Sequence, residues 1–180
     1  MSLEIVIGPM FSGKSTYALS YVRRYRSIGK SVIIVKPSID DRYTNDQVII
    51  SHDREQLPCV VWDIRLPFDP DFFINSDCIV IEEAQFFTGI HQLVSFLLLE
   101  HKKHILLVGL DGDAAQKKFG EVLDCIPLST KLLKLNSYCS LCKDGTPAPY
   151  TKRIAPENHI EQIHIGSDNL YRAVCLKHLL

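Results

Sequence analysis

The sequence predicts an α/β protein with a mostly parallel, doubly wound sheet and a small C-terminal domain built around cysteines. Three observations predict it. A glycine-rich loop, Gly8–Ser15, lies between an apolar run and a segment with a helical pattern. Short apolar runs then alternate with helical patterns, which favours a parallel sheet covered by helices. Two cysteine-containing pairs follow near the end of the chain. We expect domains over residues 1–136 and 137–180.

The loop Gly8–Ser15 has the pattern G-x-x-x-x-G-K-S. Its two glycines let backbone N–H groups turn inward as a nest for phosphate oxygens, and the helix expected at 16–26 directs its positive end at the same anion. Lys14 then reaches the β- and γ-phosphates of ATP, and Ser15 offers its hydroxyl to Mg²⁺. A plain glycine turn is the simpler alternative. The strand–loop–helix setting favours the nucleotide site and a P-loop NTPase-like sheet.

Length and composition bound the class of protein. The chain has 180 residues, 46% of them hydrophobic, and a net charge of −1, which suits one domain with an appendage. Near-neutral charge without a basic stripe argues against a nucleic-acid partner and for a small substrate. The nucleotide loop begins at Gly8 and no apolar run is long enough to span a bilayer, so we expect no membrane association and a cytoplasmic location.

The first half of the chain continues with the β-branched run 31–36, which predicts a buried parallel strand. Residues 37–58 are polar, and we interpret them as a mobile loop at the mouth of the site. Solvated charge is the simpler interpretation of the charged residues in this loop. An arginine beside a nucleotide also neutralises transferring phosphoryl oxygens, so Arg42 is a candidate catalytic residue with Lys14.

A short strand is predicted at 59–62, and a proline-containing connection follows at 66–75. The apolar run Cys78–Ile81 then ends in Glu82 and Glu83. Carboxylates at the carboxyl end of a buried strand face the crevice where α/β sheets bind ligands. One acid can hold the metal and the other can act as a general base. Alternatively, two acids that begin a helix can interact with its dipole.

A helical pattern at 89–102 and a buried strand at 104–110 follow, and the strand ends in Asp111-Gly112-Asp113 at the crevice edge. The predicted nucleotide-binding residues are the phosphate loop together with two residues near the acids: Gly8, Pro9, Met10, Phe11, Ser12, Gly13, Lys14, Ser15, Glu82 and Gln85. Mg²⁺ is expected near Ser15 and Glu82.

The C-terminal segment contains Cys139-x-x-Cys142 and Cys175-x-x-His178. Three thiolates and one imidazole form a closed tetrahedral set typical of structural zinc. Ordinary core thiols are the alternative, and that is how we interpret Cys59, Cys78 and Cys125. The zinc would cross-link a long excursion with little apolar mass. Within it, the segments 150–153 and 159–165 suggest a hairpin that clamps a ligand over the site.

Together these motifs resemble the thymidine kinase family of the zinc-bearing cellular, poxviral and bacterial type. The resemblance covers nearly the whole chain and rests on motifs that occur in the same order: Gly8-Pro-Met-Phe-Ser-Gly-Lys-Ser15, Asp40-x-Arg42-Tyr43, His52-Asp53-Arg54, Glu83-x-Gln85-Phe86-Phe87, Leu110-Asp111-Gly112, Phe119-Gly120, Cys139-x-x-Cys142, Tyr150-Thr151-Lys152-Arg153 and Tyr171 before Cys175.

The resemblance implies transfer of the ATP γ-phosphoryl group to the 5′-hydroxyl of thymidine, with Glu83 as the base and a zinc-pinned lasso closing over the nucleoside. It also implies a homo-tetramer and feedback inhibition by dTTP. The residues that it places around the nucleoside come from both parts of the chain: Met10, Phe86, Leu110, Phe119, Thr151, Gly166 and Tyr171.

The chain departs from the family pattern at several positions. Glu82 stands where aspartate is usual, His178 replaces the commoner fourth cysteine, and Ala114 stands where an aromatic residue is frequent. Gln162 and His164 occupy positions that are often apolar. We therefore expect looser base selection, including acceptance of deoxyuridine analogues with bulky 5-substituents.

Two other functions fit parts of the sequence. Ile-Glu-Glu-Ala-Gln at 81–85 is similar to the second motif of helicase-type ATPases, but such motors need a second nucleotide-binding lobe for which this chain has no residues. A small zinc-bearing ATPase or regulatory adaptor is the other alternative. Nucleic-acid-stimulated ATP turnover would favour the first, and nucleotide binding without turnover the second.

Overall fold

The computed structural model describes residues 1–39, 47–50, 55–154 and 170–180. Several sequence-predicted features lie outside these residues: Arg42 and its neighbours, His52-Asp53-Arg54, the run 159–165, and Gly166. The description that follows concerns the rest of the chain.

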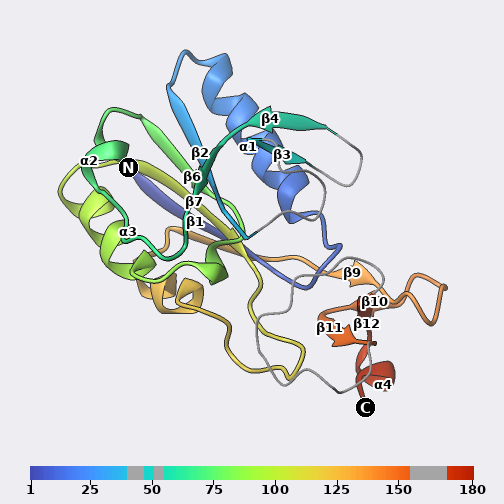
Figure 1. The fold of residues 1–180 in the computed structure, drawn as a ribbon. Helices are drawn as coiled ribbons and strands as arrows, with labels where there is room; N and C mark the ends of the chain where they lie inside the picture. The colour runs from blue at the N-terminus through green and yellow to red at the C-terminus, as the bar shows by residue number, and fades with distance from the viewer. Residues whose placement is uncertain (40–46, 51–54, 155–169) are drawn as a thin grey trace.

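A six-stranded sheet forms the centre of the molecule (Figure 1). Every pairing in it is parallel, and the strand order is β5-β2-β6-β7-β1-β8. Its strands are β1 (Ser2–Ile7), β2 (Val32–Pro37), β5 (Val60–Trp62), β6 (Cys78–Ile81), β7 (His104–Gly109) and β8 (Lys131–Lys134). The predicted α/β fold with a parallel sheet is confirmed. Because all the strands are parallel, their carboxyl ends share one edge, where the phosphate loop and both acids lie.

Helices cover both faces of the sheet, and alternate residues of each strand pack against one face or the other. On one side Val6, Val80 and Leu106 pack with α1 (Lys14–Ser27). On the other side Ile5 and Ile79 belong to a cluster shared with α3 (Ile90–Leu99) and η2 (Val122–Leu128). This double burial explains why β6 and β7 are apolar almost throughout. It fixes the positions of the strand ends that carry the site.

Three parts of this domain differ from the sequence expectation. The segment 37–58 is not all loop, because β3 (Val48–Ile50) and β4 (Gln56–Pro58) form an antiparallel pair within it. The connection at 66–75 contains the short helix α2 (Asp71–Ile74), which begins after Pro70, a residue whose φ is already helical. The edge strand β8 was not expected. Its sequence, Lys-Leu-Leu-Lys, has only two apolar residues.

In its described residues, 137–154 and 170–180, the C-terminal module forms two small antiparallel pairs and one short helix. Its elements are β9 (Ser137–Tyr138) paired with β10 (Pro147–Ala148), β11 (Tyr150–Arg153) paired with β12 (Tyr171–Val174), and α4 (Leu176–Leu179). The pairing of β11 with β12 was not predicted from the sequence, and the expected hairpin partner of 150–153, the run 159–165, lies outside the described residues. The buried residues of the module form a small cluster separate from the two clusters of the sheet.

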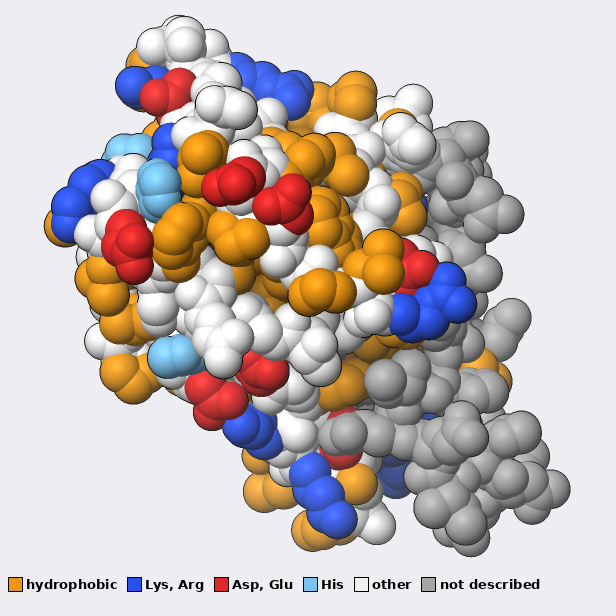
Figure 2. Space-filling view, turned by 60° about the vertical axis from the view of Figure 1, so that its left-hand side comes forward, with side chains coloured by type: hydrophobic (Ala, Val, Ile, Leu, Met, Phe, Trp, Pro, Cys, Tyr) orange, Lys and Arg blue, Asp and Glu red, His pale blue; other side chains and the backbone are white. Residues whose placement is uncertain are grey.

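The surface over α2 and α3 mixes apolar and charged side chains (Figure 2). The exposed apolar residues in this region include Leu66, Phe72 and Leu99. Among the described residues, no helix has both the length and the apolar character that a bilayer crossing requires.

Candidate active site and metal centre

The phosphate loop leaves the carboxyl end of β1 through three residues in the left-handed region. The φ angles are 149° at Gly8, 62° at Phe11 and 82° at Gly13. A side chain at Gly8 would collide with the carbonyl oxygen of Leu135, which follows β8. Gly8 thus lets the loop pass close to the neighbouring strand. Gly13 begins α1, so the positive end of that helix points toward the loop.

Lys14 is held inside this loop. Its ammonium donates a hydrogen bond of 2.7 Å to the carbonyl oxygen of Pro9, and only 7% of the residue is exposed. The hydroxyl of Ser12 donates to the same carbonyl at 2.8 Å. The lysine cation therefore already lies within the loop that its motif assigns to phosphate, and its position fits a triphosphate chain.

Ser15 and Glu82 meet between α1 and β6. The Ser15 hydroxyl donates to a carboxylate oxygen of Glu82, which is 4% exposed. The backbone N–H of Glu82 donates to the Val35 carbonyl at 2.8 Å, which extends the pairing of β6 with β2 and anchors the backbone that carries this carboxylate. A hydroxyl and a carboxylate oxygen are hard ligands of the kind that Mg²⁺ prefers, so this pair fits the ion. The longer Glu82 side chain still reaches Ser15.

The next residue, Glu83, points to a different partner. Its φ of 50° and ψ of 44° are left-handed, a conformation that costs a non-glycine residue about 1 kcal/mol. Glu83 precedes the 3₁₀ turn η1 (Ala84–Phe86) but makes no side-chain capping hydrogen bond to it. One of its carboxylate oxygens instead accepts a 2.5 Å hydrogen bond from the amide nitrogen of Gln85. Two consecutive acids thus point to separate groups.

Gln85 connects the acids to the adjacent strand. Its amide oxygen accepts a 3.0 Å hydrogen bond from the backbone N–H of Leu110, at the end of β7. Next to it, the rings of Phe86 and Phe119 meet edge to face with centroids 5.4 Å apart. Phe119 is 6% exposed. These groups form one wall beside the acid pair.

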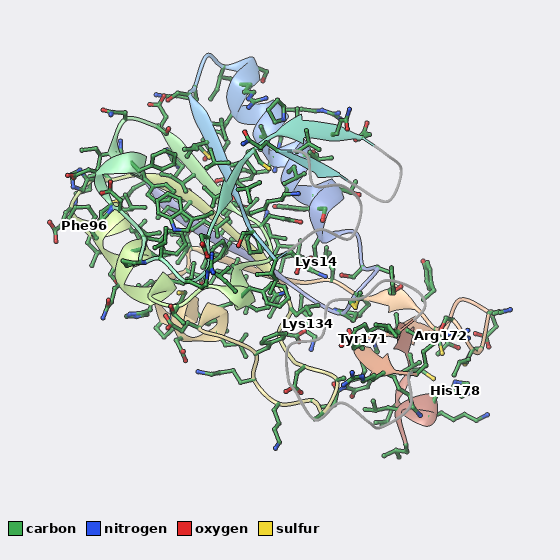
Figure 3. All side chains as sticks on the ribbon, in the orientation of Figure 1. Lys14, Phe96, Lys134, Tyr171, Arg172 and His178 are labelled. Atoms are coloured by element: carbon green, nitrogen blue, oxygen red, sulfur yellow. The ribbon has the colours of Figure 1, made fainter. Side chains whose placement is uncertain are left out.

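The C-terminal module contacts the phosphate loop directly. The Thr151 hydroxyl accepts a buried 3.0 Å hydrogen bond from the backbone N–H of Met10, and the Thr151 carbonyl accepts a 3.1 Å bond from the Gln116 side chain. Tyr171 lies opposite Arg153 in the β11–β12 pair and is 9% exposed. Burial raises the pKa of its phenol, so it stays neutral near pH 7. Figure 3 shows Tyr171 in the module and Lys14 at the sheet edge that faces it.

Sequence reasoning missed Gln116 and Lys134. The Lys134 ammonium lies 2.6 Å from a carboxylate oxygen of Asp111. Asp111 follows β7 and Lys134 ends β8, so the ion pair spans β1 at the edge where the phosphate loop begins. No local signal marks Lys134, because only the strand order brings it near Asp111. Gln116 has a φ of 62° in a turn closed by Asp113, and that aspartate was the one available signal.

The four predicted metal ligands converge in the module. His178 Nδ1 lies 3.4 Å from the Sγ atoms of Cys139 and Cys142 and 3.5 Å from that of Cys175. The Sγ atoms of Cys142 and Cys175 are 3.8 Å apart. Zn–S bonds of about 2.3 Å and Zn–N bonds of about 2.05 Å at tetrahedral angles place N and S about 3.6 Å apart and two S atoms about 3.8 Å apart. The donor set fits zinc.

The surroundings shift the pKa values of the thiols in opposite directions. Burial acts to raise the pKa of Cys139, but hydrogen bonds from nearby backbone N–H groups, that of Cys175 foremost, outweigh it and lower the pKa to about 5. Burial, with the neighbouring sulfurs, raises the pKa of Cys142 to about 11. Outside the cluster, burial raises the pKa of Cys78 and of Cys125 to about 12, as expected for inert core thiols.

A groove also lies on the α3 side of the molecule. It is lined by Pro67, Phe68, Pro70, Thr88, Gly89, Gln92, Leu93 and Phe96. Figure 3 shows Phe96 well apart from Lys14. The groove is therefore separate from the phosphate loop.

The fold and these residues define a P-loop nucleotide-binding protein with a module beside the loop that carries a cluster of three cysteines and one histidine. Comparison with known proteins specifies the family. Residues 1–179 match the family model described as "Thymidine kinase". The chain belongs to the thymidine kinase family.

Individual relatives agree. The chain is 35% identical over 183 residues to thymidine kinase a of Arabidopsis thaliana, with 99% of this chain and 75% of the relative covered. It is 38% identical over 179 residues to the thymidine kinase of sheeppox virus, with 97% and 94% covered. It is 32% identical over 177 residues to the cytosolic thymidine kinase of Homo sapiens, with 96% and 70% covered.

Proposed function

We propose that this chain transfers the γ-phosphoryl group of ATP to the 5′-hydroxyl of thymidine, giving dTMP and ADP. The observation that carries the proposal is the family match over residues 1–179. The geometry supports it, because a phosphate loop, a hydroxyl–carboxylate pair and a second buried carboxylate meet at one edge of the sheet. A zinc-bearing ATPase that acts on nucleic acid or as an adaptor is not favoured by the family match.

The loop Gly8–Ser15 is the proposed nucleotide-binding element. Backbone N–H groups of its second half and the start of α1 receive the phosphate oxygens, and Lys14 exchanges the Pro9 carbonyl for the β- and γ-phosphates. Ser15 and Glu82 hold Mg²⁺, which neutralises charge on the phosphates when it is bound. Arg42, outside the described residues, remains a candidate for neutralising the transferred group.

Glu83 is the proposed general base. The 5′-oxygen attacks the γ-phosphorus, its proton passes to the Glu83 carboxylate, and the bond to the bridging oxygen breaks to release ADP. The buried position of Glu83 suits this role, since few waters compete for the transferred group.

Nucleoside binding is proposed for the surfaces on either side of Glu83. The aromatic pair Phe86 and Phe119, with Met10 and Leu110, would pack on the thymine. Thr151 and Tyr171, with Gly166 outside the described residues, would close the site from the module. The hydrogen bond from Met10 N–H to Thr151 supports a module that shields the loop from water.

The module, residues 137–180, is proposed as a domain distinct from residues 1–136, and its zinc as structural. Three thiolates and one imidazole fill a tetrahedral coordination sphere, so no position is left for substrate. The Lys152 ammonium donates a 2.7 Å bond to the His178 carbonyl, which ties β11 to the ligand-bearing helix. Metal binding thereby holds the strand that carries Thr151.

A homo-tetramer, feedback inhibition by dTTP and a cytoplasmic location are further proposals. The first two are supported only by the family resemblance. The location is supported by relatives from Gallus gallus, Cricetulus griseus and Homo sapiens, which are named cytosolic thymidine kinases.

A panel of nucleosides incubated with γ-labelled ATP tests the proposal. We expect label on thymidine and on deoxyuridine analogues, including those with bulky 5-substituents because Ala114 is small. Glu83→Gln should lower kcat by about 10²–10⁴-fold, the usual contribution of a general base, while ATP still binds. Glu100→Gln, an exposed carboxylate at the end of α3, is the matched control. Near-normal turnover of Glu83→Gln would remove it as the base.

A further inference from the structure

The side chain of Gln85 is enclosed between the base and the neighbouring strand. Only 3% of the residue is exposed. Its amide nitrogen donates to Glu83 Oε2 at 2.5 Å, and its amide oxygen accepts from the Leu110 N–H at 3.0 Å. Both ends of the amide are therefore engaged by protein groups within the described structure.

Chemistry fixes the orientation of this amide. A backbone N–H is only a donor and an ionised carboxylate is only an acceptor. If the amide were turned over, its N–H₂ group would face the Leu110 N–H and its oxygen would face the Glu83 carboxylate. Neither of these contacts is a hydrogen bond. The group thus has one favourable orientation, in which its N–H₂ faces the carboxylate.

Two glycines make room for this residue. A Cβ at Gly109 would lie 2.7 Å from the Gln85 amide oxygen. A Cβ at Gly120, whose φ is 62°, would collide with the Gln85 backbone carbonyl. Both β7 and the turn at 120 therefore approach Gln85 closely, so its side chain has little freedom to move.

We propose that Gln85 is a positioning residue that holds the Glu83 carboxylate in the orientation needed to receive the 5′-hydroxyl proton. It acts through Glu83 and is not a nucleotide ligand. The same amide binds the backbone of Leu110, so it ties the base to the strand end that carries one of the proposed thymine contacts. The inference rests on the proposed role of Glu83.

The position of Glu83 explains why it needs such support. Its backbone is left-handed, and its side chain makes no capping bond to η1. A base displaced by about 1 Å can lose on the order of 100-fold in rate. The hydrogen bond from Gln85 acts on the oxygen position directly, because it joins side chains only two residues apart.

Gln85→Met is the first test, since it keeps similar volume and removes both hydrogen bonds. We expect kcat to fall by about 10–100-fold, while KM for thymidine and for ATP stays within about threefold. Gln85→Glu keeps an acceptor for Leu110 but places two carboxyl groups together, which disfavours ionisation of the pair, so kcat should fall here too. Gln92→Met, the same change at an exposed residue of α3, should match the wild type.

A double-mutant cycle separates positioning from general structural support. In a Glu83→Gln background, Gln85→Met should change kcat by less than about twofold, because the carboxylate it positions is already gone. An equal loss in both backgrounds would overturn the proposal in favour of a structural role. A raised KM for ATP with kcat unchanged would overturn it in favour of a nucleotide contact.

Gly109→Ala tests the position of the Gln85 amide from the side of β7. The new methyl group should displace the amide oxygen of Gln85 and lower kcat with KM little changed. If Gln85→Met turned over normally while Glu83→Gln was slow, the positioning role of Gln85 would be rejected and the role of Glu83 as the base would stand. Normal turnover of Glu83→Gln itself would instead reject the proposed base.

Discussion

The phosphate loop and the C-terminal module meet at Met10 and Thr151, yet different interactions hold them in place. The loop lies at the carboxyl edge of a sheet whose two faces are both buried under helices. Among the described residues of the module, the buried apolar side chains form one small cluster, in which Cys139 and Cys175 are themselves members. The four residues proposed as metal ligands come from two segments, 139–142 and 175–178. Backbone geometry and core packing position the first region, whereas zinc coordination, in the proposed metal-bound protein, positions the second.

The two regions should therefore be destabilised by different changes. A segment with little buried apolar area gains its folding free energy from the metal, and structural zinc contributes about 10–16 kcal/mol in small zinc-binding peptides at neutral pH. A loop packed against a sheet keeps its fold when zinc is removed, but it does not tolerate a side chain where two backbones touch. Three changes test the contrast.

Metal removal has the largest expected effect. Cys142→Ser should release zinc and unfold the module, because three ligands bind far more weakly than four. Chelation of the wild type, with Mg²⁺ returned before the assay, should have the same effect. Thymidine phosphorylation should fall by at least about 100-fold as the contacts of Thr151 and Tyr171 are lost. Binding of an ATP analogue should change by less than about threefold. Zinc content by mass spectrometry, activity and analogue binding are the measurements.

Cys59→Ala is the matched control, since this thiol is buried but lies outside the cluster. It should retain about one zinc per chain. Full activity in metal-free protein would show that the module needs no metal, and would erase the contrast between the two regions.

A pair of glycine substitutions tests the other side of the comparison and should have an intermediate effect. A Cβ at Gly8 meets the Leu135 carbonyl, whereas a Cβ at Gly13 meets nothing within 4 Å. Gly8→Ala should destabilise the protein by about 3 kcal/mol, because a backbone carbonyl cannot rotate away. Gly13→Ala should cost about 1 kcal/mol for its left-handed backbone alone. Urea unfolding gives both values, and equal costs would contradict close packing at Gly8.

The same contrast explains which features sequence could predict. The strands β6 and β7 were predictable because burial on both faces demands continuous apolar runs. Glu82 and Glu83 were identifiable because they directly follow such a run. The convergence of the three cysteines and the histidine was predictable from spacing alone, since coordination chemistry restricts it. The sequence pattern was sufficient for features whose physical cause lies within a few neighbouring residues of the chain.

Features that depend on three-dimensional neighbours were not predictable in this way. β8 has two lysines in four residues and joins the sheet only because β1 offers a free edge. Its end carries Lys134, whose partner Asp111 is distant in sequence. The pairing of β11 with β12 was also missed, because the pattern of a short strand does not specify which distant segment lies beside it.

The hydrogen bond between the two regions provides the smallest predicted effect. Thr151→Val keeps the shape of the side chain and removes the acceptor for the Met10 N–H, which then stays buried without this partner. The cost should be about 1–2 kcal/mol. Because the bond joins the module to the loop, we expect a raised KM for thymidine and earlier loss of module amide protection in hydrogen exchange, with zinc content unchanged.

Thr130→Val is the matched control for this last change. The Thr130 hydroxyl donates to the Leu3 carbonyl at 2.9 Å, far from the module in the fold, and that carbonyl also accepts the Thr130 backbone N–H. Its loss leaves the acceptor satisfied, so KM for thymidine should not change. If Thr151→Val instead matched Thr130→Val in KM and in hydrogen exchange, the loop and the module would be independent, and the contact at Met10 would have no part in closing the site.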